Sequence, residues 1–368
     1  MKNVLVFGMT ENPGGVESVI MNYYRAMDRS RVQLDFLCNS DTVAYEEEIL
    51  ALGGTVYKIP ARRDGRKAFH QALDAFMARH AREYCAIWVN VCSLANIDYL
   101  KAAKKYGIPK RIIHCHNAAN GDSFLRGLLH RYNRRVVRGV ATDFWSCSDG
   151  ACPWFYGAEA GKLPHYQLIT NAIDPAKFTQ DPQVRQEYRR RLGCEDALVV
   201  GHVGRFHFQK NQSFLLDVVS ELARMGQPVK ALLVGQGEDL EPMKEKARTL
   251  GLADQVEFLG VRSDTAQLYQ AMDVFVFPSQ FEGLPMALLE AQANGLPCVV
   301  SDAIVPEIQV NPNLYRLSLQ DSPKQWAECV VHKALKAGRV DQTQFAHSLY
   351  DINSQVQRLQ ALLTEEAL

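Results

Sequence analysis

Short apolar runs alternate with segments of helical periodicity along almost the whole chain, and they do so in two series. The runs NVLVFG, VQLDFLC, TVYKI, AIWVNV, RIIHCH, TDFWSCS and YQLIT form the first series. A polar stretch with two prolines, TNAIDPAKFTQDPQVRQEYRRRLGCEDA, interrupts it, and a second series begins at LVVGHVGRF. Because continuous apolar strands are buried on both faces, helices must cover both sides of each sheet. The sequence therefore predicts an α/β protein with two doubly wound parallel sheets in series.

The interruption also sets the expected domain boundaries. A chain of 368 residues suits two domains of ordinary size. We expect an N-terminal domain over residues 1–170 and a C-terminal domain over residues 171–345. The last helical stretch, residues 346–368, could pack on either domain, and we place it back on the N-terminal one.

Composition narrows the class of partner and the compartment. Lysine plus arginine and aspartate plus glutamate each number 41, so the formal net charge is zero and no overall field attracts nucleic acid. No run approaches the roughly 20 apolar residues that span a bilayer, and MKNVLVFGMT lacks the signal-peptide pattern. The nine cysteines are scattered without CxxC spacing, as in a reducing compartment. A cytoplasmic protein with reduced cysteines is expected.

Open parallel sheets bind ligands beyond the carboxyl ends of their strands, so the loops there are the first candidates for a site. The first of these loops, GMTENPGGVES, places Gly14 and Gly15 just before a helix. Free backbone N–H groups and the helix dipole favour an anion at that point. The loop matches neither GxGxxG nor a Walker motif, and a plain tight turn is the alternative.

Two histidines end the strand-like run RIIHCH. His114 and His116 share one face of the strand because side chains alternate with a period of two. No carboxylate or cysteine stands at metal-ligand spacing beside them, so a metal site is not expected. A buried, hydrogen-bonded core histidine is one interpretation. The other is that His116, nearer the strand end, faces a cleft between the two sheets.

Two cations follow the first strand of the second series, in GHVGRFHFQKN. Arg205 and Lys210 stand at that strand end, ahead of a helix. Arginine offers a fork of donors and lysine a mobile point charge, which together suit a diphosphate. The alternative is a pair of solvated surface cations.

Two glutamates flank the start of a later helix in FPSQFEGLPMALLEAQANGLPCVV. Glu282 falls in the loop after a strand, and Gly283 would let a ligand approach the backbone closely. Glu290 follows eight residues later, about 80° past two full helical turns and so on nearly the same side. Two carboxylates there could grip a polyhydroxylated ligand. The alternative is that Glu282 and Glu290 are ordinary solvent-exposed residues at a helix surface.

Taken in order, several segments resemble one family. GRFHFQKN, VGQGEDL, EFLGVRSD, DVFVFPSQFEGLPMALLEAQANGLPCV and the linker ITNAIDPAKF are similar to the retaining GT-B glycosyltransferases of family 4, the glycosyl transferases group 1. The closest likeness is to the bacterial capsule and exopolysaccharide branch. The resemblance covers nearly the whole chain and is strongest in its second half. It implies two Rossmann-like domains that face each other across a cleft, the first on the acceptor side and the second on the nucleotide-sugar side.

The resemblance also implies a role for each matching residue. Glu290 would hold the ribose hydroxyls of a nucleotide sugar, and Arg205 and Lys210 would neutralise its leaving diphosphate. Glu282 would hold the donor sugar, which His116 would contact. The implied catalytic residues are His116, Arg205, Lys210 and Glu282. The implied substrate-binding residues are Gly14, Gly15, Asn171, Gly204, Val261, Arg262, Gly283, Leu284, Pro285, Met286 and Glu290.

The sequence departs from the family pattern in three places. Asn171 is followed by alanine where many members have glycine. The sugar loop reads GLPM in place of the commoner GFGL. After SDA the chain reads IVPEIQVNPNLY, without the usual glycine-rich loop.

The expected reaction is transfer of a hexose or hexosamine, with retention, from a UDP-linked sugar to a glycan or lipid-linked oligosaccharide in polysaccharide biosynthesis. No Asp-x-Asp pair follows a strand, so Arg205 and Lys210 are expected to replace a metal, and no cofactor is expected. The loop at 117–123 is expected to choose the acceptor. A nucleotide-sugar epimerase of the same plan and a non-catalytic nucleotide-sugar sensor are the alternatives. A nicotinamide dehydrogenase fits least, since VLVFGMTENPGG lacks its fingerprint.

One basic helix suggests a further partner. FLRGLLHRYNRRVVRG places cationic side chains on one half of a helical wheel and Leu125, Leu128, Leu129, Tyr132 and Val136 on the other. The cationic set is Arg126, His130, Arg131, Arg134, Arg135 and Arg138. Attraction to an anionic membrane at the inner face of the cell would suit a lipid-linked acceptor. A solvated basic face is the alternative.

Overall fold

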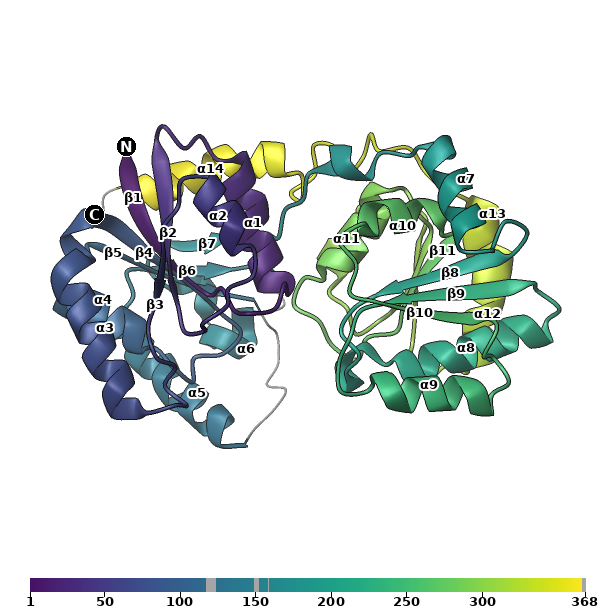
Figure 1. Cartoon of the computed structure of the whole chain (residues 1–368), viewed down its shortest axis with the longest axis horizontal. Coiled ribbons are helices and arrows are strands. Elements are labelled where there is room, and N and C mark those ends of the chain that lie inside the picture. The colour runs from purple at the N-terminus through teal and green to yellow at the C-terminus, as the bar shows by residue number, and fades with distance from the viewer. Residues whose placement is uncertain (117–123, 149–151, 158, 366–368) are drawn as a thin grey trace. The chain divides into compact units, whose positions relative to one another are not determined.

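The computed structural model describes residues 1–116, 124–148, 152–157 and 159–365, so the predicted acceptor loop 117–123 lies outside the described residues. The chain folds into two compact units (Figure 1). Unit 1 is Met1–Ala172 together with Ile352–Leu368, and unit 2 is Ile173–Asp351. In each unit helices flank a parallel sheet.

Unit 1 is built on a parallel sheet with the strand order β3-β2-β1-β4-β5-β6-β7 within its described residues. The strands are β1 (Lys2–Phe7), β2 (Val32–Cys38), β3 (Val56–Lys58), β4 (Tyr84–Val91), β5 (Lys110–Cys115), β6 (Asp143–Ser146) and β7 (Tyr166–Leu168). The helices are α1 (Gly15–Ala26), α2 (Glu46–Ala51), α3 (Arg66–His80), α4 (Asp98–Lys105), α5 (Phe124–Val136), α6 (Cys152–Tyr156) and α14 (Ile352–Thr364).

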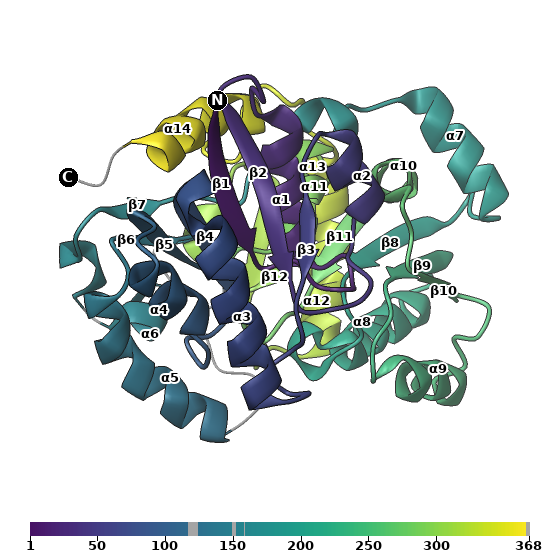
Figure 2. The same cartoon turned by 60° about the vertical axis from the view of Figure 1, so that its left-hand side comes forward.

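The last helix of the chain completes unit 1. In both Figure 1 and Figure 2 the yellow α14 lies beside α1, and it also contacts β4. Leu359 and Leu363, one turn apart, are fully buried. The Gln360 side chain accepts from the backbone N–H of Asp28 at 3.2 Å and donates to its carbonyl at 3.0 Å. The helix begins at Ile352, later than residue 346, because the residues before it form turns.

Unit 2 is built on a second parallel sheet, with the strand order β10-β9-β8-β11-β12-β13 within its described residues. The strands are β8 (Leu198–Val203), β9 (Val229–Val234), β10 (Val256–Gly260), β11 (Val274–Phe277), β12 (Cys298–Ser301) and β13 (Leu314–Leu317). The helices are α7 (Pro182–Arg191), α8 (Gln212–Arg224), α9 (Leu240–Thr249), α10 (Thr265–Ala271), α11 (Met286–Ala293), α12 (Pro323–Cys329) and α13 (Leu335–Ala337).

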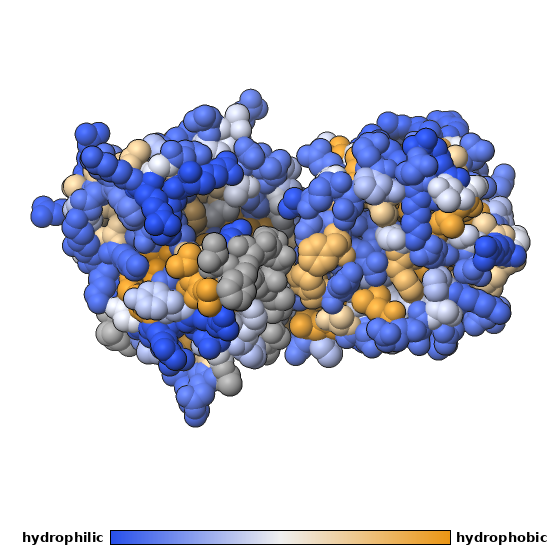
Figure 3. Space-filling model, turned by 90° about the horizontal axis from the view of Figure 1, so that it is seen from below, coloured by the Kyte–Doolittle hydropathy of each residue, from blue (hydrophilic) through white to orange (hydrophobic). Residues whose placement is uncertain are grey.

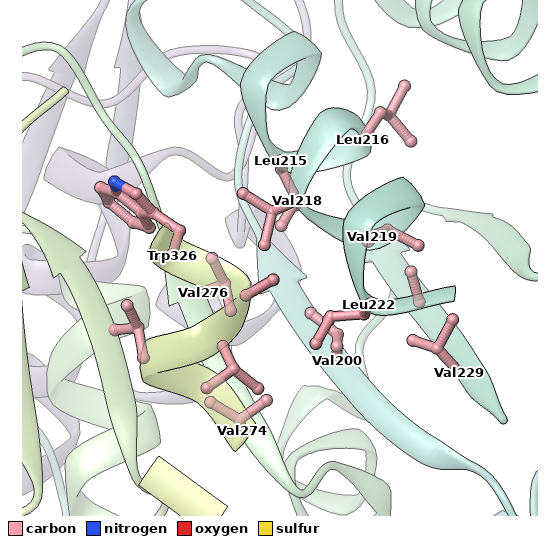
Figure 4. Packing of buried hydrophobic residues seen from close by; sticks show 14 of the residues in the cluster. Val200, Leu215, Leu216, Val218, Val219, Leu222, Val229, Val274, Val276 and Trp326 are labelled. Atoms are coloured by element: carbon pink, nitrogen blue, oxygen red, sulfur yellow. The ribbon is translucent and has the colours of Figure 1, made fainter. Parts of the chain in front are cut away.

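The core of unit 2 explains why its strands carry continuous apolar runs. Figure 4 shows Leu215 and Val218 of α8 and Trp326 of α12 packed with sheet valines such as Val276. Trp326 also donates its indole N–H to the Ser318 carbonyl at 3.0 Å, so its polar atom is satisfied. Burial on this scale stabilises each large side chain by roughly 1.5–3 kcal/mol and fixes the sheet on which the site is built.

The prediction of two doubly wound parallel sheets is confirmed, with one omission. The sequence reading missed β13, which pairs with β12 from Cys298–Leu314 to Ser301–Leu317. Its segment LYRL is short and holds an arginine, so its apolar pattern is weak. Arg316 donates to the carbonyls of Ile304 at 2.5 Å and Val305 at 2.9 Å, which satisfies the polar group in the strand.

Each sheet contains one point at which the strand order reverses. In unit 1 the reversal falls between β1 and β4, and in unit 2 between β8 and β11. Loops from the carboxyl ends of two neighbouring strands diverge there and leave a crevice for ligands. The two reversal points are therefore where functional side chains are expected in each unit.

Candidate active site

At the reversal point of unit 2, the loops after β8 and β11 bring Lys210 and Glu282 together. Lys210 Nζ lies 2.6 Å from Oε1 of Glu282 and 4.9 Å from the centroid of the Phe277 ring. The Lys210 side chain is 18% exposed and that of Glu282 is 7% exposed. Bulk water screens such a pair weakly, so an anion that displaced Glu282 from the lysine would be attracted to it strongly. The structure thus couples two predicted site residues that are far apart in the sequence.

Backbone contacts hold these two loops in place. The Gln280 N–H donates to the Gln209 carbonyl at 2.8 Å, and the Gln209 side chain donates to the Phe281 carbonyl at 2.8 Å. At Gly235, after β9, φ is +137° and an added Cβ would lie 2.1 Å from the Gly204 carbonyl oxygen. Only glycine allows this close approach. The site loops are therefore set before any ligand arrives.

A buried polar network lies beneath the loops. His202 of β8 donates from Nδ1 to the Val276 carbonyl at 3.0 Å, and its Nε2 accepts from the Gln212 side chain at 3.3 Å. Gln212 also donates to the Arg205 carbonyl at 2.9 Å. Burial lowers the pKa of His202 to about 4, so the ring is neutral near pH 7. This network links β8, β11 and α8 to the backbone that carries Arg205.

Arg205 does not share a carboxylate with Lys210. Its guanidinium NH2 group lies 2.9 Å from Oε2 of Glu238, in the loop after β9, and its side chain is 69% exposed. His207 Nε2 lies 3.5 Å from the other Glu238 oxygen. The Glu238 backbone N–H and the Arg205 guanidinium lower the pKa of the Glu238 carboxyl group. Arg205 is thus a solvent-facing cation whose partner is Glu238, not the carboxylate of the more buried pair.

Glu290 lies on α11, partly buried, with its Oε2 2.9 Å from the Tyr269 hydroxyl of α10. Burial raises the pKa of Glu290 to about 7, and the hydrogen bond with Tyr269 opposes the rise. Gly283, Leu284 and Pro285 are buried between Glu282 and the start of α11 at Met286. No side chain caps this helix start, where backbone N–H groups and the dipole favour negative charge.

At the reversal point of unit 1, β1 ends against Asn90 of β4. Gly8 has φ of +138°, and an added Cβ there would lie 2.7 Å from Asn90 Cβ. Farther along the same loop, Gly14 precedes α1 without a side-chain cap, and a Cβ on Gly15 would meet no atom within 4 Å. The Glu17 carboxylate of the first turn accepts from the Thr10 hydroxyl at 2.6 Å. Both predicted glycines therefore stand at this helix start.

His116 follows β5 and lies in the same corner of unit 1. Its Nε2 lies 2.9 Å from Oδ1 of Asn90, and its ring centroid lies 4.2 Å from that of His114. Burial lowers the pKa of His116 to about 3, and the Asn171 side chain opposes the shift. His114 is the buried core histidine of the pair: it accepts from Trp88 Nε1 at 3.3 Å and donates to the Ile169 carbonyl at 3.1 Å.

The loop predicted near the base of a nucleotide contains one exposed and one paired residue. Val261 is 56% exposed. Arg262 donates from Nε to Asp264 Oδ1 at 2.8 Å, and this pairing lowers the pKa of Asp264 to about 2. Both residues follow β10, which β9 and β8 separate from β11 in the sheet.

The basic helix α5 departs from its helical-wheel prediction at one residue. His130, assigned to the cationic face, is buried and stacks on Trp154 at 4.3 Å, because its Nδ1 accepts the Leu94 backbone N–H at 3.1 Å. Leu128, Leu129 and Tyr132 are exposed. Arg126, Arg131, Arg135 and Arg138 are exposed beside them, and Arg134 is partly buried. Figure 3 shows this side of unit 1 from below, with apolar atoms bordered by hydrophilic ones.

Sequence reasoning missed three residues that shape these sites. Asn90 is the second-last residue of the apolar run AIWVNV, so attention to strand ends could have found it. Glu238 follows the strand VKALLV and could have been found in the same way. Tyr269 lies inside a helix and carries no local signal, since its role depends on the packing of α10 against α11.

No helix in the described part of the chain is both long and apolar enough to cross a membrane. Across residues 1–116, 124–148, 152–157 and 159–365, no three histidine, cysteine, aspartate or glutamate side chains gather as metal ligands would.

Comparison with known proteins gives the class. The model of the family described as Glycosyl transferases group 1 matches residues 184–331. "Putative glycosyltransferase EpsF" of Bacillus subtilis (strain 168) is 35% identical over 342 residues, which is 89% of this chain and 86% of EpsF. The structure of HepE from Anabaena in complex with UDP and glucose superposes with a TM-score of 0.81 at 20% identity, over 99% of this chain and 100% of HepE.

A second relative matches a shorter segment. The UDP-Gal:alpha-D-GlcNAc-diphosphoundecaprenol alpha-1,3-galactosyltransferase of Escherichia coli is 33% identical over 139 residues, 37% of this chain and 36% of the relative. The fold and these matches define a glycosyltransferase with a GT-B fold. Within that class, the chain belongs to the group 1 glycosyl transferases.

Proposed function

We propose that this glycosyltransferase transfers a hexose or hexosamine, with retention and without a metal, from a UDP-linked sugar to a glycan or lipid-linked oligosaccharide in polysaccharide biosynthesis. The observation that carries the proposal is the Lys210–Glu282 pair at the reversal point of unit 2, on the same sheet as the Glu290–Tyr269 pair. We place the chain in family 4 and its capsule and exopolysaccharide branch. Two of the similar proteins support a UDP-linked donor. The HepE structure contains UDP, and the Escherichia coli relative is named for UDP-Gal.

The charges of unit 2 suit the chemistry of the leaving group. Breaking a sugar–phosphate bond develops negative charge on the diphosphate and positive charge at the anomeric carbon. Lys210 sits in a water-poor place, where a fixed cation stabilises developing charge without reorganisation. Arg205, exposed beside it, can turn from Glu238 to a phosphate and offer two parallel donors. We assign both residues to the diphosphate.

The carboxylates of Glu290 and Glu282 would accept hydrogen bonds from hydroxyl groups of the nucleotide sugar. An ionised carboxylate accepts two hydroxyl hydrogen bonds at once, so Glu290 suits the 2′ and 3′ hydroxyls of a ribose. Glu282 becomes an acceptor for the donor sugar when Lys210 turns to phosphate. We assign the backbone of Gly283, Leu284 and Pro285 to the same sugar, Val261 and Arg262 to the base, His116 to the donor sugar and Gly15 to the diphosphate. The remaining predicted residues, Gly14, Asn171, Gly204 and Met286, would support these groups.

We also propose that α5 contacts an anionic membrane from the cytoplasmic side. Exposed Leu128, Leu129 and Tyr132 supply apolar contact, and the arginines around them supply positive charge. This combination on one helix suits a surface-lying segment, as an enzyme with a lipid-linked acceptor would need.

A panel of nucleotide sugars tested by thermal shift checks the main proposal. Binding to the folded state raises the melting temperature with the logarithm of ligand concentration over Kd. We expect one UDP-sugar to raise it for the wild type and for Glu221→Ala, a helix glutamate away from the site, but not for Glu290→Ala. UDP release that depends on an added glycan would then separate a transferase from an epimerase or a sensor. A panel in which no nucleotide or nucleotide sugar shifts the wild type would overturn the proposal.

A further inference from the structure

Asn90 lies between two sets of hydrogen-bonding groups at the reversal point of unit 1. On one side its amide Nδ2 faces the carbonyl oxygens of Phe7 and Trp88, each at 3.4 Å. On the other side its Oδ1 lies 2.9 Å from Nε2 of His116. Asn90 is buried, so these groups cannot turn to water instead.

The carbonyl pair fixes the orientation of the amide. If the amide were rotated by 180°, its oxygen would face two carbonyl oxygens, and all three can only accept. With the NH2 group toward Phe7 and Trp88, Oδ1 is the atom that remains for His116, and it needs a donor. Nε2 of His116 must therefore carry a proton.

The neutral imidazole ring of His116 carries a single N–H proton, on either Nδ1 or Nε2. Burial keeps the pKa of His116 near 3, so the ring is neutral at pH 7. Among the described residues, its titratable neighbour is His114 of β5, which is buried and neutral as well, and its polar neighbours are the amides of Asn90 and Asn171. A neutral ring with its proton on Nε2 has a lone pair on Nδ1.

Nδ1 is the atom available for a ligand. It is buried, and no residue of the described chain makes a hydrogen bond of normal geometry with it. A buried polar atom in that condition calls for a partner. A sugar hydroxyl can supply one, because it donates to a lone pair while its oxygen accepts elsewhere.

We infer that Asn90 is a positioning residue that holds His116 as the Nε2–H tautomer, so that Nδ1 accepts a hydrogen bond from a hydroxyl group of the transferred sugar. The inference rests on the proposed function for the identity of the ligand, but the tautomer does not depend on it. Asn90 acts through His116 and touches no substrate. Gly8 contributes because a side chain there would collide with Asn90 and turn its amide.

Long-range ¹H–¹⁵N correlation spectra of the histidine-labelled full chain test the tautomer directly. The His116 signal is assigned by its loss in His116→Gln. We expect a pyrrole-type Nε2 and a pyridine-type Nδ1 in the wild type. In Asn90→Ala and Asn90→Leu, which lack any side-chain acceptor, the proton should be shared between the two nitrogens. Asn133→Ala is the matched control, since it removes another buried amide, bonded to the Leu94 carbonyl at 2.6 Å, and should leave His116 unchanged.

Turnover supplies the second measurement, with UDP-glucose as the probe and UDP release as the signal. We expect kcat to fall about tenfold in Asn90→Ala with the Kd for UDP unchanged, since one oriented hydrogen bond is lost. A wild-type ring with its proton on Nδ1, or an Asn90→Leu ring with an unchanged tautomer, would overturn the inference. The wild-type spectrum tests the predicted tautomer of His116 even if neither variant folds. If the wild type turned over no nucleotide sugar, the proposed function would fail while the spectra still decided the role of Asn90.

Discussion

The Tyr269 hydroxyl lies 2.9 Å from Oε2 of Glu290 and 3.1 Å from the Ala287 carbonyl oxygen, which ties α10 to α11 through a carboxyl group with a raised pKa. A phenol has one proton to give. When Glu290 is protonated, it can donate to Tyr269, and Tyr269 can then donate to Ala287. When Glu290 is ionised, Tyr269 must donate to the carboxylate. The empty site therefore favours the protonated form, whereas two ribose hydroxyls would need the ionised one.

This conflict predicts a pH-dependent stability. The folded pKa of Glu290 is raised from 4.5 to about 7, so its contribution to stability is fully present below about pH 4.5 and is lost as pH rises through 7. The loss by pH 8 should be on the order of 3 kcal/mol. Thermal unfolding of the wild type and of Glu290→Gln, without ligand, checks it. Glu290→Gln should be the more stable protein at pH 8. Parallel curves for the two proteins between pH 5 and pH 8 would contradict the assignment.

Removing the cation of the buried pair should harm both folding and turnover. In Lys210→Met the Glu282 carboxylate, 7% exposed, is left without its counter-charge, which should cost about 3 kcal/mol of unfolding free energy. The kcat for UDP release should fall about 100-fold or more, because a fixed charge at the leaving group is lost. Adding Glu282→Gln to Lys210→Met should recover most of the stability and none of the turnover. If the double variant is as active as the wild type, Lys210 does not serve the leaving group.

Glu238 should compete with the diphosphate for Arg205. The two side chains pair at 2.9 Å in an exposed position, so the pair is weak, but a phosphate must displace it. Glu238→Gln should therefore bind UDP a few-fold more tightly, and Arg205→Gln more weakly, with both differences shrinking at high salt. Calorimetric titration with UDP at low and high ionic strength measures this. Weaker binding in Glu238→Gln would show that Glu238 helps the ligand instead.

The exposed arginines of α5 should govern binding to anionic vesicles. Arg131→Gln with Arg135→Gln should lower the partition coefficient on phosphatidylglycerol-containing vesicles roughly 30-fold, since each basic residue contributes about 1 kcal/mol at such a surface. Arg190→Gln with Arg191→Gln, on α7 of unit 2, removes the same charge from another exposed helix and should change little. Equal losses in the two pairs would point to net charge alone. No binding by the wild type at low salt would remove the membrane proposal.

Much of the architecture could be predicted because the apolar runs in the sequence mark the strands of both sheets. Each sheet strand except β13 follows from a continuous apolar run, and the rule on strand ends led to Lys210 and Glu282 separately. What periodicity does not encode is which loops become neighbours. Lys210 and Glu282 are 72 residues apart, and they meet because β8 lies beside β11 in the sheet.

The helical wheel misplaced His130 of α5 for a related reason. A wheel separates polar from apolar side chains, but it does not say which half of the helix the rest of the unit covers. Here the covered side includes His130 and Asn133, both bonded to the Leu94 backbone, while leucines and a tyrosine remain exposed. Hydrogen bonds to the Leu94 backbone therefore fix which side of α5 packs on unit 1, although hydropathy alone would favour the side with the leucines.

The return of α14 to unit 1 has a consequence for how the protein is made. Ribosomes deliver the chain from its N-terminus, and domains generally fold as they emerge. Unit 1 needs Leu359 and Leu363 to cover its sheet and Gln360 to bond Asp28, so its last piece is translated after the whole of unit 2. The nascent first unit must wait with an apolar face uncovered while some 180 further residues are synthesised, and a premature stop just before residue 352 would leave it permanently unfinished.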